Sequence, residues 1–196
     1  IGYYAPEDFR LWERCITKGG MPNVMFPRGY NNNTMIVQAP GYVAIYHEMI
    51  HEVRIIPLDG RPHLPQTIRQ WDGDGRGHWE GETLVVETTN LHQMVSALQP
   101  WANYRSSEGS GEKMRLVERF TRVDADTIDY MVTVEDPVIY TRPWTVRLPL
   151  ARNDEPIFEY ACHEGNYSVP AMFKGQAEID AAKTKPFGFQ AFYPGP

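Results

Sequence analysis

Alternation of apolar and polar residues in the second half of the chain constrains the fold more than any other sequence feature. Within residues 127–135, every second side chain is apolar: Ile128, Tyr130, Val132 and Val134. Such spacing places these side chains on one face of a strand. Residues 114–122 have a similar β-type composition, and Asp124-Ala125-Asp126 separates the two segments as a turn. The pattern predicts an antiparallel hairpin with one buried face.

Further short β-type segments surround this hairpin. We expect strands over residues 34–38, 42–57, 83–89, 145–150 and 157–162. Because strands usually contain about 3–10 residues, segment 42–57 requires a bulge or a tight hairpin near residues 49–51. Residues 58–81 are rich in Pro, Gly and Asp, and we predict that they form a long, ordered loop outside the strands.

This arrangement favours a mainly β fold, either a single antiparallel β-barrel of the lipocalin type or a sandwich. Short helices are expected at both ends of the chain, over residues 6–15 and 171–183. With no repeat or linker in the sequence, residues 1–196 are predicted to form one domain. The N-terminal helix and loop occupy 1–33, the barrel core 34–163, and the C-terminal helix and tail 164–196.

The chain has two cysteines, Cys15 and Cys162, near its opposite ends. Two thiols do not make a zinc-finger framework, and neither belongs to a C-x-x-C motif. We predict one long-range disulfide, which implies an oxidising compartment, periplasmic or secreted. The alternative is a pair of buried free thiols in a cytosolic protein.

Charge and hydropathy limit the partners. The formal net charge is −6, without long runs of one sign, which disfavours binding to a nucleic-acid backbone. No stretch approaches the roughly 18 consecutive apolar residues of a membrane helix, so we expect no membrane insertion. The expected partner is a small-molecule ligand, and the sequence does not indicate an oligomeric state.

Residues 47–51 read His-Glu-Met-Ile-His, which matches the zinc-binding pattern H-E-x-x-H. That motif needs a helix, whereas the surrounding Val and Ile residues favour a strand. On a straight strand the two histidines would lie about 13 Å apart, too far to share a zinc ion. We therefore predict no metal site here.

A tight turn at Met49-Ile50 would make Glu48 and His51 cross-strand neighbours. A carboxylate and an imidazole so placed form an acid/base pair near neutral pH. Glu48, His51 and Arg54 are therefore the candidate catalytic residues, with Arg54 orienting an anionic group. The alternative, to which we give equal weight, is that Glu48 and His51 form a solvent-exposed pair at the end of a hairpin and have no catalytic role.

Other polar and aromatic residues near predicted strands are candidates for binding a substrate. They are His47, Glu118, Tyr140, Arg142, Trp144 and Glu159. Asp72-Gly73-Asp74-Gly75-Arg76-Gly77 superficially resembles a calcium loop, but Arg76 stands at a ligand position, so a glycine-rich turn is the better interpretation. No cofactor is expected.

The chain contains the motifs IIPLDGRPH (55–63), GHWEGETLVVETTN (77–90), EDP (135–137), YTRPWT (140–145) and YACHEGNY (160–167). With these motifs it resembles one large group of exported bacterial proteins that are usually labelled hypothetical. The resemblance implies export and a shared fold, and it implies no particular reaction.

Two hypotheses for function follow. The first is an exported enzyme that applies acid/base chemistry, of lyase, isomerase or hydrolase type, to a small organic or sugar-like molecule in a barrel pocket. The second is a lipocalin-like carrier of an apolar ligand. The polarity of the binding cavity discriminates between them, because a carrier needs an apolar lumen and an enzyme needs converging charged groups.

Overall fold

The computed structural model describes residues 2–95 and 111–183, and this part of the chain is mainly β. Its strands form a three-stranded and a five-stranded sheet, both antiparallel. The small sheet has the order β1 (Thr34–Ala39), β2 (Tyr42–His47) and β3 (Val53–Pro57). The large sheet is a meander of β4 (Asp74–Glu80), β5 (Thr83–Thr89), β6 (Arg115–Arg122), β7 (Thr127–Glu135) and β8 (Trp144–Ala151).

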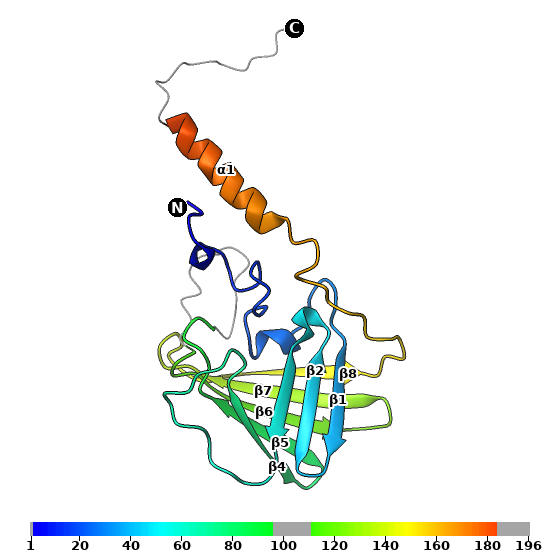
Figure 1. The fold of residues 1–196 in the computed structure, drawn as a ribbon. Coiled ribbons are helices and arrows are strands. Elements are labelled where there is room, and N and C mark those ends of the chain that lie inside the picture. The colour runs from blue at the N-terminus through cyan, green and yellow to red at the C-terminus, as the bar shows by residue number, and fades with distance from the viewer. Residues whose placement is uncertain (1, 96–110, 184–196) are drawn as a thin grey trace.

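The two sheets pack face to face, and the strands of the small sheet run across those of the large one (Figure 1). One apolar core joins Val43, Ile45 and Ile56 of the small sheet to Leu116 and Val132 of the large one. Strand β3 lies next to β4, whereas no ladder of hydrogen bonds joins β1 to β8 in the described part of the chain. The architecture is therefore sandwich-like and open along the β1 and β8 edges.

The strand predictions are confirmed for most of the chain, and the hairpin of β6 and β7 lies where the alternation predicts it. Two predictions were wrong. Residues 157–162 were expected to be a strand, but they pair with no sheet. The glycine-rich segment after Asp72 was interpreted as a turn, yet Asp74–Glu80 forms β4 because its backbone pairs with β5 along its whole length.

The helix prediction is confirmed at the C-terminal end, where α1 spans Ser168–Lys183. At the N-terminal end it was wrong, because only Pro6–Asp8 is helical, as the 3₁₀ helix η1. Phe9 is extended (φ −90°, ψ 152°). This places its ring 4.8 Å from the Tyr3 ring and 4.9 Å from the Phe173 ring of α1, so tertiary packing overrides the local helical pattern.

The predicted disulfide between Cys15 and Cys162 is confirmed. It joins the N-terminal segment, which also contains the 3₁₀ helix η2 (Asn23–Met25), to the segment that follows β8. Helix α1 projects away from the sheets beside the N-terminus (Figure 1). No described helix has the length and apolar character needed to span a bilayer.

Candidate functional site

A groove of about 1050 Å³ lies between the β1 edge of the small sheet and the β7–β8 side of the large one. We call it the β1–β8 groove. Its apolar lining comes from both sheets and from the segment after η2. These residues include Met25, Phe26, Ile36, Val43, Leu84, Phe120, Ile128, Leu148 and Leu150.

Strand alternation explains why the floor of this groove is apolar. In the large sheet, Leu84, Phe120, Tyr130 and Leu148 stand opposite one another on the inner face. On β6 and β7 these positions are buried, whereas Ile128, Leu148 and Leu150 are only half-buried. The small sheet therefore covers the middle of the large sheet and leaves the inner face of β8 open to the groove.

Among the described residues that line the groove, the charged ones are all exposed and form its rim: Glu82, Arg122, Asp126, Arg152 and Glu155. Glu82 and Asp126 lie in turns, Arg122 ends β6, and Arg152 and Glu155 follow β8. Arg152 is paired with two carboxylates. Arg152 Nη1 lies 3.5 Å from Asp126, and its Nε lies 2.8 Å from Asp154. At one end, the Asn153 side chain donates a 2.8 Å hydrogen bond to Asn33 Oδ1 and so links the two sides of the groove.

A buried polar network lies behind this groove, between the two sheets. Arg54 donates two hydrogen bonds to Glu118, at 3.0 and 2.5 Å, and a third of 3.3 Å to the Thr88 hydroxyl. The Tyr130 hydroxyl donates to Glu118 at 3.0 Å. Glu118 and Tyr130 are fully buried, and Arg54 belongs to β3, so this network joins the inner faces of the two sheets through side chains.

A second polar cluster, composed of His47, Glu52 and Asp72, contains buried atoms without hydrogen-bond partners. These atoms are His47 Nε2 and Asp72 Oδ1, whereas the Glu52 carboxylate interacts with the Thr17 side chain and the Lys18 backbone. The other ring nitrogen of His47 lies 3.2 Å from the Thr34 hydroxyl. His47 and Glu52 are brought together by the backbone hydrogen bond from the His47 N–H to the Glu52 carbonyl, 2.8 Å.

Burial shifts the proton affinities in this second cluster. Burial, together with the nearby Asp72 carboxylate, raises the pKa of Glu52 to about 8. Burial raises the pKa of Asp72 to about 6. Burial and the Arg54 and Arg28 cations lower the pKa of His47 to about 3, so this imidazole is neutral near pH 7. Shifted groups of this kind are common where proteins perform acid/base chemistry.

The three residues predicted to be catalytic bind three different partners. The Glu48 carboxylate is buried and accepts hydrogen bonds from the backbone N–H groups of Phe158 (3.0 Å) and Asn33 (3.4 Å). His51 is exposed, and its Nδ1 lies 3.0 Å from the Tyr160 carbonyl. Arg54 binds Glu118. The His51 backbone N–H donates a 3.1 Å hydrogen bond to the Glu48 carbonyl, but no side-chain hydrogen bond or ion pair joins any two of Glu48, His51 and Arg54 in residues 2–95 and 111–183.

The turn predicted between Glu48 and His51 is present as the 3₁₀ helix η3 (Met49–His51). Before this turn, the buried residues of β2 are the odd-numbered ones, Val43, Ile45 and His47. After it, the even-numbered residues Arg54 and Ile56 of β3 are buried. Segment 47–51 is therefore not the continuous helix that an H-E-x-x-H zinc site requires. Within the described residues, no group of three His, Cys, Asp or Glu side chains is arranged to hold a metal ion.

The residues predicted to bind substrate are dispersed. His47 and Glu118 belong to the two interior clusters. Tyr140 and Trp144 pack edge to face, with their ring centroids 5.6 Å apart, and burial raises the pKa of Tyr140. Arg142 is exposed in the connection before β8.

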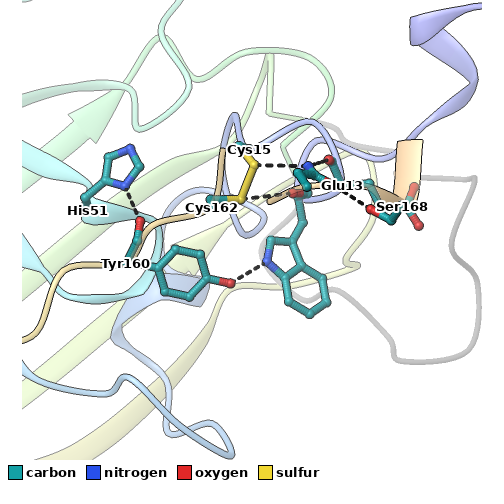
Figure 2. The surroundings of a disulfide bond; sticks show 8 residues. Glu13, Cys15, His51, Tyr160, Cys162 and Ser168 are labelled. Carbon is teal, nitrogen blue, oxygen red and sulfur yellow. Dashed lines mark hydrogen bonds between the residues drawn. A yellow bond between two sulfur atoms is a disulfide. The ribbon is translucent and has the colours of Figure 1, made fainter. Parts of the chain in front are cut away.

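Glu159 lines a smaller pocket of about 420 Å³ beside the disulfide, together with Trp12, Tyr160 and Cys162. In this region the Trp12 Nε1–H donates a 3.0 Å hydrogen bond to the Tyr160 hydroxyl, next to the Cys15–Cys162 bond (Figure 2). The pocket is shallow and open. Its contacts join the N-terminal segment to the chain after β8.

Sequence reasoning missed Glu52, Asp72 and Tyr130 as members of buried polar clusters. Tyr130 was assigned correctly to the inner face of β7, so its hydroxyl required a buried partner, and Glu118 at an inner position of β6 was the available one. Glu52 was missed because the tight turn predicted at Met49-Ile50 does not by itself assign a face to the residues that follow His51. No pattern in the sequence indicates Asp72.

No family model, curated protein or solved structure matches this chain. Its function therefore has to be inferred from the geometry of its own residues.

Proposed function

We propose that this protein binds a small, mostly apolar organic molecule in the β1–β8 groove and acts as a carrier. The observation that supports this is the distribution of charge: the groove floor is apolar, and charged side chains line only its rim. A volume of about 1050 Å³ suits one drug-sized or lipid-sized molecule. An interior built for catalysis would instead expose converging charged groups to the ligand.

The rim adds an expectation about the ligand. Arg122, Asp126 and Arg152 surround an apolar floor, so a molecule with an apolar body and a polar end satisfies both parts of the groove. Its apolar body would contact Ile36, Leu148 and their neighbours, and its polar end would face water at the rim. We expect amphiphilic ligands to bind more tightly than purely polar ones.

The expected compartment is outside the cytoplasm. The Cys15–Cys162 bond is of a kind that persists in oxidising compartments. The resemblance to exported bacterial proteins suggests the periplasm or secretion. A carrier in that position would move an apolar molecule through an aqueous space.

A titration with the fluorescent apolar probe N-phenylnaphthylamine tests the proposal. Leu148 lines the groove, so Leu148→Trp should fill part of it and weaken binding by about tenfold. The matched control is Arg147→Trp on the adjacent outward-facing position of β8, where the side chain is 71% exposed. The control should bind as the parent protein does. Equal affinity in all three proteins would refute binding in this groove.

Acid/base catalysis is the second candidate, and the His47, Glu52 and Asp72 cluster favours it. A neutral Glu52 and an ionised Asp72 would form a carboxylic acid and a carboxylate in one enclosed place, the pairing that general acid/base catalysis uses. In this second candidate function, Glu52 and Asp72 take the acid/base role predicted for Glu48 and His51. Arg54 holds the Glu118 carboxylate in position.

The two candidates differ in what happens to the bound molecule. Incubation of a groove ligand with stoichiometric protein, followed by mass spectrometry of the ligand, separates them. A carrier returns the ligand unchanged. An enzyme converts it, and Glu52→Gln should lower the conversion rate by about 100-fold or more. Because His47, Glu52 and Asp72 do not line the β1–β8 groove, conversion also requires the ligand to reach the interior cluster.

A further inference from the structure

The smaller pocket beside the disulfide differs from the β1–β8 groove in the chemistry of its lining. We call it the Cys15–Cys162 pocket. It has a volume of about 420 Å³, and no described residue lines both it and the groove. Three segments supply its wall: Trp12 and Glu13 from the N-terminal segment, Asn31 from the loop before β1, and several residues of 159–168 from the segment after β8. A ligand here therefore binds separately from one in the groove.

The charged side chains that line this pocket are all acidic. They are Glu13, Glu159 and Glu164, and no Lys, Arg or His side chain of residues 2–95 and 111–183 joins them. Glu13 is already paired, because its carboxylate accepts a 2.9 Å hydrogen bond from the Arg10 backbone N–H and lies 3.7 Å from the Arg10 side chain. Glu159 and Glu164 are exposed, and neither belongs to an ion pair in that part of the chain. These two carboxylates remain available to a positively charged ligand.

Aromatic rings provide a second feature that favours a cation, and it is independent of the carboxylates. Trp12 and Tyr160 both line the pocket, and the Trp12 Nε1–H donates a 3.0 Å hydrogen bond to the Tyr160 hydroxyl (Figure 2). The face of a tryptophan ring attracts ammonium groups. In this protein the Trp12 ring already has one, because Lys18 Nζ lies 2.6 Å from its centroid. The three carboxylates of the pocket outnumber this single ammonium group.

The wall of the pocket is held in place by contacts between its segments. The disulfide joins the N-terminal segment to the segment after β8. Beside it, the Asn166 side-chain amide donates a 3.0 Å hydrogen bond to the Glu13 carbonyl, and the Ser168 hydroxyl donates to Asn166 Oδ1 (Figure 2). A wall that is ordered before the ligand arrives lowers the entropic cost of binding.

We propose that the Cys15–Cys162 pocket binds a small organic cation that carries an ammonium group. Trp12 and Tyr160 contact its apolar substituents, and Glu159 and Glu164 balance its charge. An anion is repelled by these carboxylates, and a neutral molecule gains no ion pair from them. Because the pocket is shallow and its carboxylates are exposed, we expect a dissociation constant on the order of 1 mM.

A titration of the full chain with choline, followed by amide chemical shifts, tests this inference. The matched ligand is neohexyl alcohol, in which a carbon atom replaces the choline nitrogen, so that the shape is kept and the charge is lost. It should bind about fivefold more weakly than choline or worse. Glu159→Gln combined with Glu164→Gln should weaken choline binding by about fivefold and leave the binding of neohexyl alcohol unchanged. Because both side chains are exposed, the double variant should fold as the parent does.

Glu82→Gln is the matched control, because Glu82 is also exposed but lines the β1–β8 groove. It should bind choline as the parent protein does, and the choline-induced shifts should lie around Trp12 and Tyr160. Absence of choline binding up to about 50 mM would overturn the proposal. The same holds if choline and neohexyl alcohol bind equally well, or if Glu82→Gln weakens choline binding as much as the double variant does.

Discussion

Removal of the Arg54 side chain should be among the most destabilising single changes in this protein. Arg54→Met keeps a long, flexible side chain but leaves the Glu118 carboxylate buried with only the Tyr130 hydroxyl as a partner. Loss of one member of a buried ion pair typically costs about 3–5 kcal/mol, because an uncompensated charge stays in the interior. Since domains of this kind are stable by about 5–15 kcal/mol, the change should be large enough to measure easily.

Arg115→Met provides the comparison. Arg115 also binds two carboxylates, but on the solvated face of the same sheet, with 38% of its side chain exposed. Its removal should cost about 1 kcal/mol or less, since exposed ion pairs contribute little. Urea unfolding followed by tryptophan fluorescence measures both values, and the slope of the transition shows whether the variants unfold in the same way.

A double variant separates the ion pair from the packing around it. Arg54→Met with Glu118→Leu removes both charges, so it should recover most of the stability lost in Arg54→Met alone. If Arg54→Met destabilises no more than Arg115→Met, the interior network does not hold the two sheets together. A second result would also contradict the prediction. If Arg54→Met with Glu118→Leu lost as much additional stability as a separate core defect costs, the two side chains would not be energetically coupled.

Two further predictions concern pH and the disulfide. Because burial raises the pKa of Glu52 to about 8, the folded protein keeps a proton that the unfolded chain loses above about pH 4.5. Glu52 therefore lowers stability as the pH rises through this window, by up to about 1.4 kcal/mol per pH unit. Glu52→Gln should flatten the fall in the urea midpoint between pH 5 and 8, and an unchanged slope would contradict the shifted pKa. Reduction of Cys15–Cys162 should lower the unfolding free energy by up to about 4–5 kcal/mol, as the chain-entropy model gives for so long a loop. A melting temperature that is unaffected by a reductant would contradict this.

Local alternation was sufficient to predict most of the fold. The period of two in residues 127–135 is strong enough to identify β7 and its inner face, and the neighbouring turn fixes the hairpin with β6. The disulfide followed from the number and placement of the cysteines. These features depend on short-range pattern or on a simple count, which explains why they could be read without a structure.

The interior clusters could not be predicted in the same way, because they depend on where the chain turns. The turn at Met49–His51 reverses which positions of the small sheet face inward, so Arg54 and Glu52 are buried and Val53 and Ile55 are exposed. Relative to an unbroken strand, this turn exchanges the two faces of β3. The β1–β8 groove was also beyond prediction, since it arises because β1 and β8 do not pair.

The most direct test of the proposed function is to locate a bound apolar probe by NMR. Chemical shifts of the methyl groups should be compared with and without N-phenylnaphthylamine. Our account predicts saturable changes at groove methyl groups, including those of Ile36, Leu84 and Leu148, with no comparable changes at Val53 or Ile55. Changes confined to outward-facing residues of the small sheet, such as Val53 and Ile55, or to residues around the Cys15–Cys162 pocket, would show that the β1–β8 groove is not the binding site.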